Sequence, residues 1–164
     1  FVVTIRDITA RKLEELEMTR EARTDTLTGL PNRRAFLDIL ERRLDVADQE
    51  PFGLAFVDLD HFKSINDIHG HLAGDKVLHD IAERLTTCFR AQDLFCRMSG
   101  DEFLFVLVNV SSEEARQITE RCRSLISRVP VSYEGTTINV TISLGTVWSA
   151  TYAPFETLRK PLLS

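Results

Sequence analysis

The stretch DLFCRMSGDEFLFVLVNV, residues 93–110, carries the strongest structural signal of the chain. Apolar residues fill both of its halves, 93–98 and 103–110, and short apolar runs bounded by turn residues are typical of buried β-strands. The turn between the two halves predicts a β-hairpin, and its tip carries two acids, Asp101 and Glu102. We therefore expect a sheet with carboxylates at one of its ends.

A second apolar run, residues 52–59, ends in two further acids, Asp58 and Asp60. Its nearly continuous apolar character predicts a central strand that is buried on both faces. If the two acidic strand ends are neighbours in one sheet, their carboxylates converge at one edge. Hard oxygen ligands without an accompanying cysteine favour Mg²⁺ or Mn²⁺, which a nucleotide phosphate site needs. Strand-end acids are also common without a metal, so a purely structural role stays open.

The other segments alternate between helical and strand patterns, without an internal repeat. The first 24 residues predict a short strand and then a polar helix, whose thin apolar stripe suits a linker or coiled-coil seam. Between residue 60 and residue 75 the chain is rich in Asn, Asp, His and Gly, which predicts a loop. Further on we expect these elements: a helix after Pro31, a helix over about 75–90, a helix capped by Ser111, and a final hairpin of strands 131–133 and 136–148.

Length and composition restrict the class of protein. The chain has 164 residues, 43% of them hydrophobic, and a net charge of -5, which suits one globular domain with a short appendage. No basic excess draws it to nucleic acid or to an anionic membrane, and no apolar run is long enough to span a bilayer. Cys88, Cys96 and Cys122 are odd in number and form no C-x-x-C pair, which argues against disulfides or zinc and favours reduced thiols in a cytoplasmic domain.

Three motifs occur in order: DTLTGLPNRR at 25–34, DLDHFKSINDIHGHLAGD at 58–75 and RMSGDEF at 97–103. Together with the later Ser143-Leu144-Gly145, they resemble the GGDEF family of diguanylate cyclases. The resemblance implies an α+β sandwich, with a central, mostly antiparallel five-stranded sheet flanked by helices. It also implies condensation of two GTP molecules into cyclic di-GMP by a homodimer, because one half-site holds one GTP.

The resemblance also assigns roles to single positions. It implies that Asp58, Asp101 and the backbone carbonyl of Leu59 hold Mg²⁺ or Mn²⁺. Asp101 is the implied proton acceptor, with Glu102 beside it as a second acidic participant. An amide and a carboxylate can together recognise the edge of guanine. The implied substrate-binding residues are Phe62, Lys63, Asn66, His71, Asp75 and Gly100.

The segment from Arg90 to Asp93 lies five residues before Ser99 and resembles the R-x-x-D site at which product dimers inhibit this family. Arginine presents a planar fork to phosphate and to guanine, which suits such a ligand. An isolated R-x-x-D is otherwise an ordinary solvated helix end. We therefore expect an inhibitory cyclic di-GMP site here, with the solvated helix end as the alternative.

The sequence departs from the family pattern in two places. Ser99 replaces the first glycine of the signature, and after Gly145 the usual C-terminal helix with its Lys and Arg is missing. The domain boundaries that we expect are 23–164 for the GGDEF domain and 1–22 for the tail of a PAS-type sensor with its signalling helix. The departures leave an alternative open, a catalytically impaired domain that binds GTP or cyclic di-GMP as a regulatory module.

Overall fold

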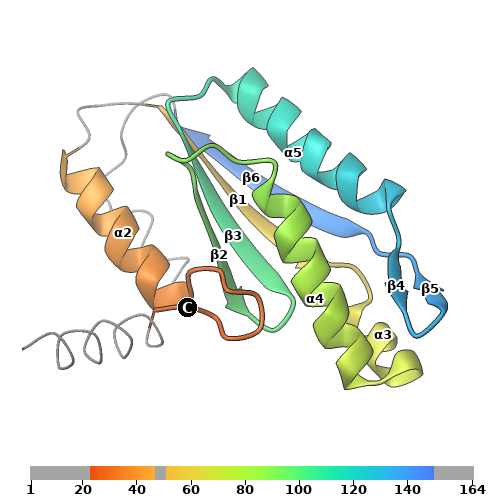
Figure 1. The fold of residues 1–164 in the computed structure, drawn as a ribbon. Helices are drawn as coiled ribbons and strands as arrows, with labels where there is room; N and C mark the ends of the chain where they lie inside the picture. Colours follow the sequence, from red (N-terminus) through yellow and green to blue (C-terminus); the bar gives the residue numbers. More distant parts are fainter. Residues whose placement is uncertain (1–22, 47–50, 150–164) are drawn as a thin grey trace, which may run out of the picture.

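The computed structural model describes residues 23–46 and 51–149 (Figure 1). Helices and strands are mixed along this part of the chain, as the sequence predicts. The elements are α2 (Arg33–Val46), β1 (Phe52–Leu59), α3 (Phe62–His69), α4 (His71–Thr86), β2 (Leu94–Ser99), β3 (Glu102–Val108), α5 (Ser112–Arg128), β4 (Val131–Tyr133), β5 (Thr136–Ile138) and β6 (Ile142–Ser149).

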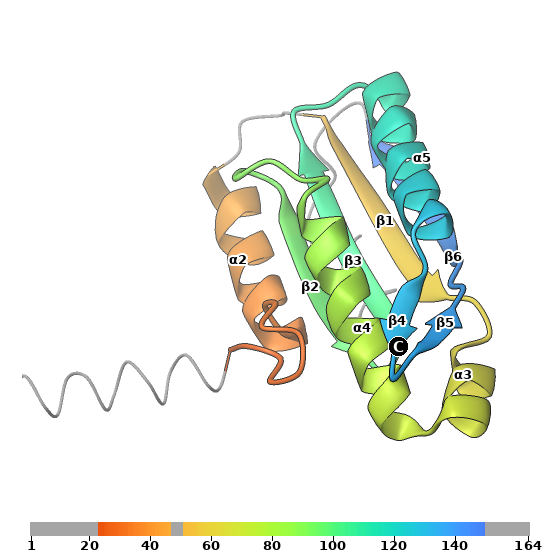
Figure 2. The same cartoon turned by 45° about the vertical axis from the view of Figure 1, so that its right-hand side comes forward.

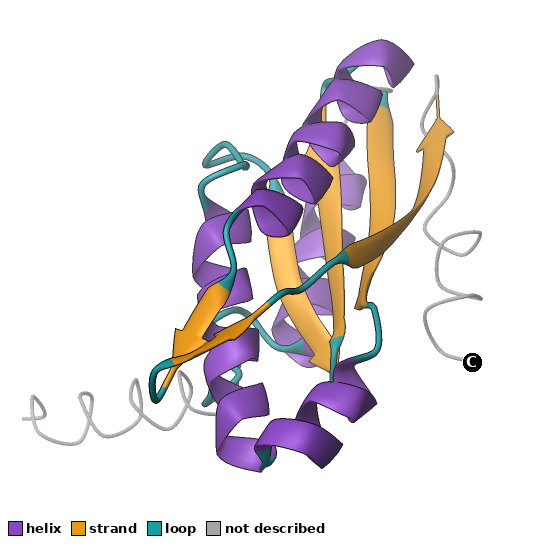
Figure 3. Ribbon diagram, turned by 90° about the vertical axis from the view of Figure 1, so that its right-hand side faces the viewer, coloured by secondary structure: helices purple, strands orange, loops and turns teal. Residues whose placement is uncertain are grey.

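The described residues form a central sheet of four strands in the order β2-β3-β1-β6, in which every neighbouring pair is antiparallel. Strand β1 is central, as its apolar run predicts. Among the described residues this sheet has four strands rather than the expected five, because the predicted strand 136–148 is interrupted and its first part, β5, pairs with β4 in a separate hairpin (Figure 3). In the gap Val140 is buried, and Thr141 accepts a 3.0 Å backbone hydrogen bond from Asp60. These contacts hold residues 139–141 against the loop after β1, so that they do not continue the strand.

Helices cover both faces of the sheet (Figures 1 and 2). Helices α4 and α5 pack on one face, around Val57, Phe103 and Phe105. Helix α2 packs on the other face, against the β2 side. This second face is covered incompletely, because Phe56 on β1 remains 39% exposed and Val147 on β6 remains 60% exposed.

The region predicted as a loop between residues 60 and 75 is instead largely helical. Its side chains follow a helical pattern, in which Ile65 is buried and Phe62 packs against the core, so the Asn, Asp and His residues lie mostly on the solvent side. Helix α4 consequently begins at His71 rather than at the predicted residue 75. Polar composition alone favoured a loop, and the burial of two apolar residues overrides it.

Several other expectations are confirmed. Ser111 caps α5 in a reciprocal capping box with Glu114, and the three cysteines are free and buried. None of the described helices is long and apolar enough to cross a bilayer. The expected PAS tail and signalling helix (residues 1–22), and the question of a helix after β6, lie outside the described residues.

Candidate functional site

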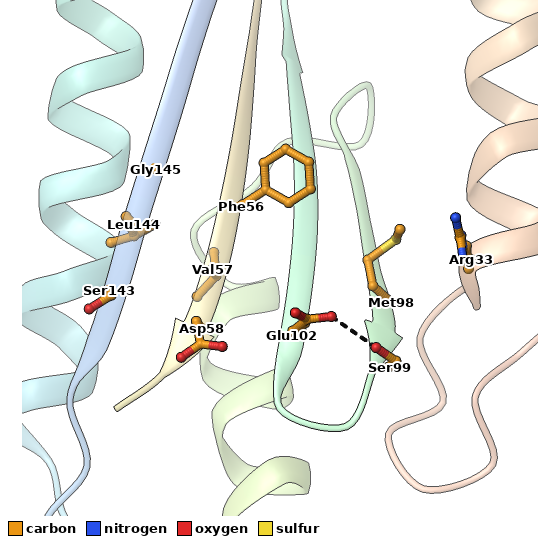
Figure 4. Close-up of a pocket in the computed structure, with 10 residues that line it drawn as sticks. All are labelled: Arg33, Phe56, Val57, Asp58, Met98, Ser99, Glu102, Ser143, Leu144 and Gly145. Carbon is orange, nitrogen blue, oxygen red and sulfur yellow. Dashed lines mark hydrogen bonds between the residues drawn. The ribbon is translucent and has the colours of Figure 1, made fainter. Parts of the chain in front are cut away.

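A row of polar side chains crosses the sheet at the end where β1 finishes. Asp58 pairs in register with Glu102 of β3 on one side and with Ser143 of β6 on the other, and Glu102 pairs in turn with Ser99 of β2. All four line a cavity of about 600 Å³ on the α2 face of the sheet (Figure 4). The cavity is polar at this row and apolar above it, where Phe56 forms part of its wall. The acidic strand ends predicted from the sequence are therefore neighbours.

The acids at this end of the sheet also interact electrostatically. Partial burial and the nearby carboxylates of Asp101, Glu102 and Asp60 raise the pKa of Asp58. Carboxylates that repel one another and offer only oxygen ligands fit a hard divalent cation such as Mg²⁺. The acids are not gathered into a finished metal cage, however, because the ligand oxygens of Asp58, Asp101 and Glu102 do not all lie within 4.8 Å of one another.

Asp60 organises the loop rather than facing the cavity. Its carboxylate accepts hydrogen bonds of 2.6 Å from Ser143 Oγ and from Thr141 Oγ1. These two hydrogen bonds lower the pKa of Asp60. The side chain thus fixes the start of β6 next to the end of β1, and with it the position of Ser143 beside Asp58.

Arg97 ties the hairpin tip to the first motif. It donates hydrogen bonds of 2.9 and 2.7 Å to the Gly100 carbonyl and one of 2.9 Å to Asp25 Oδ1. Partial burial raises the pKa of Asp25, but hydrogen bonds from Thr28 and Arg97 outweigh this effect and hold it below its usual value. Gly100 has a φ of 49°, a left-handed conformation that glycine adopts without strain. Arg97 therefore braces the tip that carries Asp101.

Ser99 occupies its position without backbone strain, because its φ is negative. A serine at this signature position therefore needs no unusual dihedral angle. Its hydroxyl donates a 2.9 Å hydrogen bond to Glu102 Oε2 (Figure 4). The hydroxymethyl group thus contacts an acid of the candidate site directly.

The two predicted guanine readers come from neighbouring helices, Asn66 from α3 and Asp75 from α4. The helices approach each other closely at Gly74, where a Cβ atom would stand 1.9 Å from Asn66 Oδ1 and 3.2 Å from Phe62 Cζ. Asn66 is half-buried and Asp75 is exposed. Gly74 was quoted only as part of a motif, and the signal that would have identified its role is a glycine inside a helical segment.

The other predicted residues divide between the two ends of the sheet. Lys63 in the first turn of α3 and His71 at the start of α4 are exposed, on the two helices that follow the end of β1. Arg90 and Asp93 lie before β2, whereas Ser99 ends it, and six strand residues separate these points by about 20 Å. The Asp93 carboxylate accepts hydrogen bonds from the backbone amides of Arg90, at 2.8 Å, and Val108, at 3.3 Å. A mostly apolar cavity of about 340 Å³ adjoins them.

Within the described part of the chain, three potential ligand atoms come within 4.8 Å of one another only at His79, Asp80 and Glu83 on α4. Asp80 is already paired with Lys76, at 2.6 Å, and lies 4.0 Å from Arg84. This group is an ion-pair network on the exposed side of the helix. It is separate from the histidines of the second motif, at positions 61, 69 and 71.

Comparisons with known proteins agree with the fold and the motifs. The chain matches the profile of the family described as "Diguanylate cyclase, GGDEF domain" over residues 22–160. It is 44% identical to diguanylate cyclase DgcP of Pseudomonas aeruginosa over 133 residues, which are 79% of this chain and 20% of that protein. It is 36% identical to the cyclic di-GMP phosphodiesterase PdeR of Escherichia coli over 115 residues, 70% of this chain and 17% of that protein. The solved structure of the coiled coil and GGDEF domain of DgcB from Caulobacter crescentus, in complex with c-di-GMP, matches with a TM-score of 0.77 at 30% identity, covering 85% of this chain and 76% of that one. The chain thus spans about a fifth of the length of the two curated relatives.

Proposed function

Because this chain belongs to the GGDEF-domain family of diguanylate cyclases, we propose that it condenses two GTP molecules into cyclic di-GMP. The observation that carries the proposal is the convergence of Asp58, Asp101 and Glu102 at one end of the sheet. Negative charge at this point can bind a divalent cation, which in turn can bind a polyphosphate. A domain that served only as a scaffold would have no need for acids gathered at one end of the sheet.

In this proposal the oxygen ligands Asp58, Asp101 and the Leu59 carbonyl hold Mg²⁺ or Mn²⁺. When bound, the cation neutralises phosphate charge and makes the α-phosphate more susceptible to attack. Leu59 is suited to the part, because its side chain is anchored in the core at 1% exposure while its backbone ends β1 beside Asp58.

Recognition of the nucleotide is assigned to the α3 and α4 helices. Asn66 and Asp75 bind the guanine edge, which an amide and a carboxylate distinguish from adenine by opposite donor and acceptor positions. Lys63 supplies charge to the phosphates, together with backbone amides near Phe62 and at Gly100. His71 orders the substrate between the two helices.

Proton transfer is assigned to the hairpin tip. Asp101 accepts the proton of the attacking 3′-hydroxyl, and Glu102 takes part as a second acid. The two reacting nucleotides come from two domains that face each other, so the active form is a homodimer. We place the protein in the bacterial cytoplasm, where an upstream PAS-type sensor sets the pairing of the domains through the signalling helix that the sequence predicts within residues 1–22.

Product inhibition is assigned to Arg90 and Asp93, at the far end of β2. The hydrogen bonds from Arg90 and Val108 to Asp93 hold this turn in shape, and the adjoining apolar cavity offers a surface on which a purine can stack. In the test, Arg90→Ala should weaken cyclic di-GMP binding by about tenfold, the value of one lost charged contact. An unchanged affinity would defeat this assignment.

The alternative function is a catalytically impaired domain that binds GTP or cyclic di-GMP and regulates a neighbouring domain. It is favoured by Ser99, which differs from the family signature. It is also consistent with the similarity to PdeR, whose name describes a phosphodiesterase rather than a cyclase.

The deciding experiment is to incubate the purified chain with GTP and Mg²⁺ and to measure cyclic di-GMP by chromatography. We expect product from the unchanged chain, and a decrease of about 10²- to 10⁴-fold for Asp101→Asn. Glu83→Gln, which alters an exposed acid on α4, is the control and should leave the rate unchanged. Binding of GTP without any product would overturn the cyclase proposal and support the regulatory module.

A further inference from the structure

Glu102 lies between a hydrogen-bond donor, Ser99, and a second acid, Asp58. On the β2 side the Ser99 hydroxyl donates a 2.9 Å hydrogen bond to Glu102 Oε2. On the β1 side lies the carboxylate of Asp58, which pairs in register with Glu102. Neighbouring strands are about 4.8 Å apart, so the hydrogen bond from Ser99 draws one oxygen of the Glu102 carboxylate toward β2.

Without a cation, both forces on Glu102 act in the same direction. The hydroxyl attracts its carboxylate toward β2, and the charge of Asp58 repels it from β1. The structure agrees with the first of these forces, since Glu102 Oε2 lies 2.9 Å from Ser99 Oγ. Figure 4 shows the Glu102 carboxylate with one oxygen directed at Ser99.

We infer that Ser99 is a positioning residue that holds Glu102 away from the metal site. This inference rests on the proposed function only in taking Asp58 as a metal ligand. A cation bound at Asp58 attracts Glu102 toward β1, and this attraction competes with the hydrogen bond from Ser99. The serine therefore weakens metal binding, whereas glycine or alanine at this position has no hydroxyl with which to compete.

The test uses Mn²⁺ in place of Mg²⁺ and measures its binding to the 164-residue chain, without nucleotide, from the electron paramagnetic resonance signal of the free ion. Ser99→Ala and Ser99→Gly should each bind Mn²⁺ about two- to fivefold more tightly, which is the value of one solvent-exposed hydrogen bond. Ser99→Thr keeps the hydroxyl and should bind as the unchanged chain does. Ser99 is exposed, so none of these changes disturbs the core.

A double-mutant cycle isolates the contact. In the Glu102→Gln background, Ser99→Ala should give no further gain, because the charged acceptor is gone. An equal gain in both backgrounds, unchanged or weaker binding in Ser99→Ala, or no Mn²⁺ binding in any variant would each overturn the inference.

The two proposals fail separately. A chain that binds Mn²⁺ more tightly after Ser99→Ala but forms no cyclic di-GMP contradicts the cyclase and supports the role of Ser99. A chain that forms cyclic di-GMP and shows no change in Mn²⁺ affinity contradicts only the role of Ser99.

Discussion

Replacing Gly74 by alanine should impair nucleotide binding while the fold remains intact. The new methyl group would stand 1.9 Å from Asn66 Oδ1, whereas ordinary contacts begin near 3.4 Å, so the amide must move by about 1.5 Å. The closest atom is the end of a flexible side chain, and alanine favours a helix over glycine by about 1 kcal/mol. The melting temperature should therefore change by only a few degrees.

The expected loss is in the recognition of the guanine base of GTP. If Asn66 reads guanine, its displacement leaves a polar group of the base unpaired, at a cost of about 1–3 kcal/mol. This cost corresponds to a rise of about 5- to 150-fold in the KM for GTP. The assay is the initial rate of cyclic di-GMP formation over a range of GTP concentrations, accompanied by thermal unfolding.

A comparison with Asn66→Ala tests the reasoning. Removing the amide creates room for the methyl group, so Gly74→Ala should add little to the defect of Asn66→Ala. A Gly74→Ala chain with an unchanged KM would refute the link between the helix contact and the base. A fully additive double variant would refute the assignment of the clash to Asn66.

Three further predictions concern stability. Arg97→Met should lower the free energy of unfolding in urea by about 2–3 kcal/mol, because Asp25 and the Gly100 carbonyl lose their partners; Arg34→Met, at an exposed position, should change it little, and equal effects would contradict the brace. Hydrogen bonds from Ser143 and Thr141 hold the pKa of Asp60 below its usual 3.8. Ionised Asp60 therefore stabilises the fold fully above about pH 3.8, and this stabilisation is lost as the pH falls through the lower pKa of the folded state. Asp60→Asn should therefore flatten the decrease in melting temperature between about pH 5 and pH 3, and parallel curves would disprove this. Ser111→Ala should lower the free energy of unfolding by about 1 kcal/mol by removing the cap of α5, while Ser112→Ala should lower it by less than half of that. Urea denaturation measures both values, and the opposite ranking would contradict the role of the cap.

Local patterns predicted those elements whose stability depends on their own residues. The apolar runs of β1, β2 and β3 identified buried strands, and Ser111 followed by Glu114 identified the start of α5. The sequence pattern predicted the wrong structure where contacts with other elements outweigh local composition. Helix α3 forms in a polar segment because Phe62 and Ile65 pack on the core. The last strand is broken because Asp60, about 80 residues earlier, holds Thr141.

The candidate site divides in the same way. The motifs alone located the acids, predicted the guanine readers and carried the resemblance to the family. They did not show that Arg97 joins Asp25 to the hairpin tip, or that Gly74 leaves space for Asn66. Both contacts depend on how separate elements pack together, which the spacing of the residues along the chain does not reveal.

By itself, the sequence determined which residues are acidic, which segments are apolar and which family the motifs resemble. Only the tertiary structure placed Ser99, Glu102, Asp58 and Ser143 in one row across four strands. The physical reason is that this row depends on the register of three antiparallel strand pairs. A slip of one residue in any pair would turn that side chain to the other face of the sheet, and the register is fixed by the packing of both faces together.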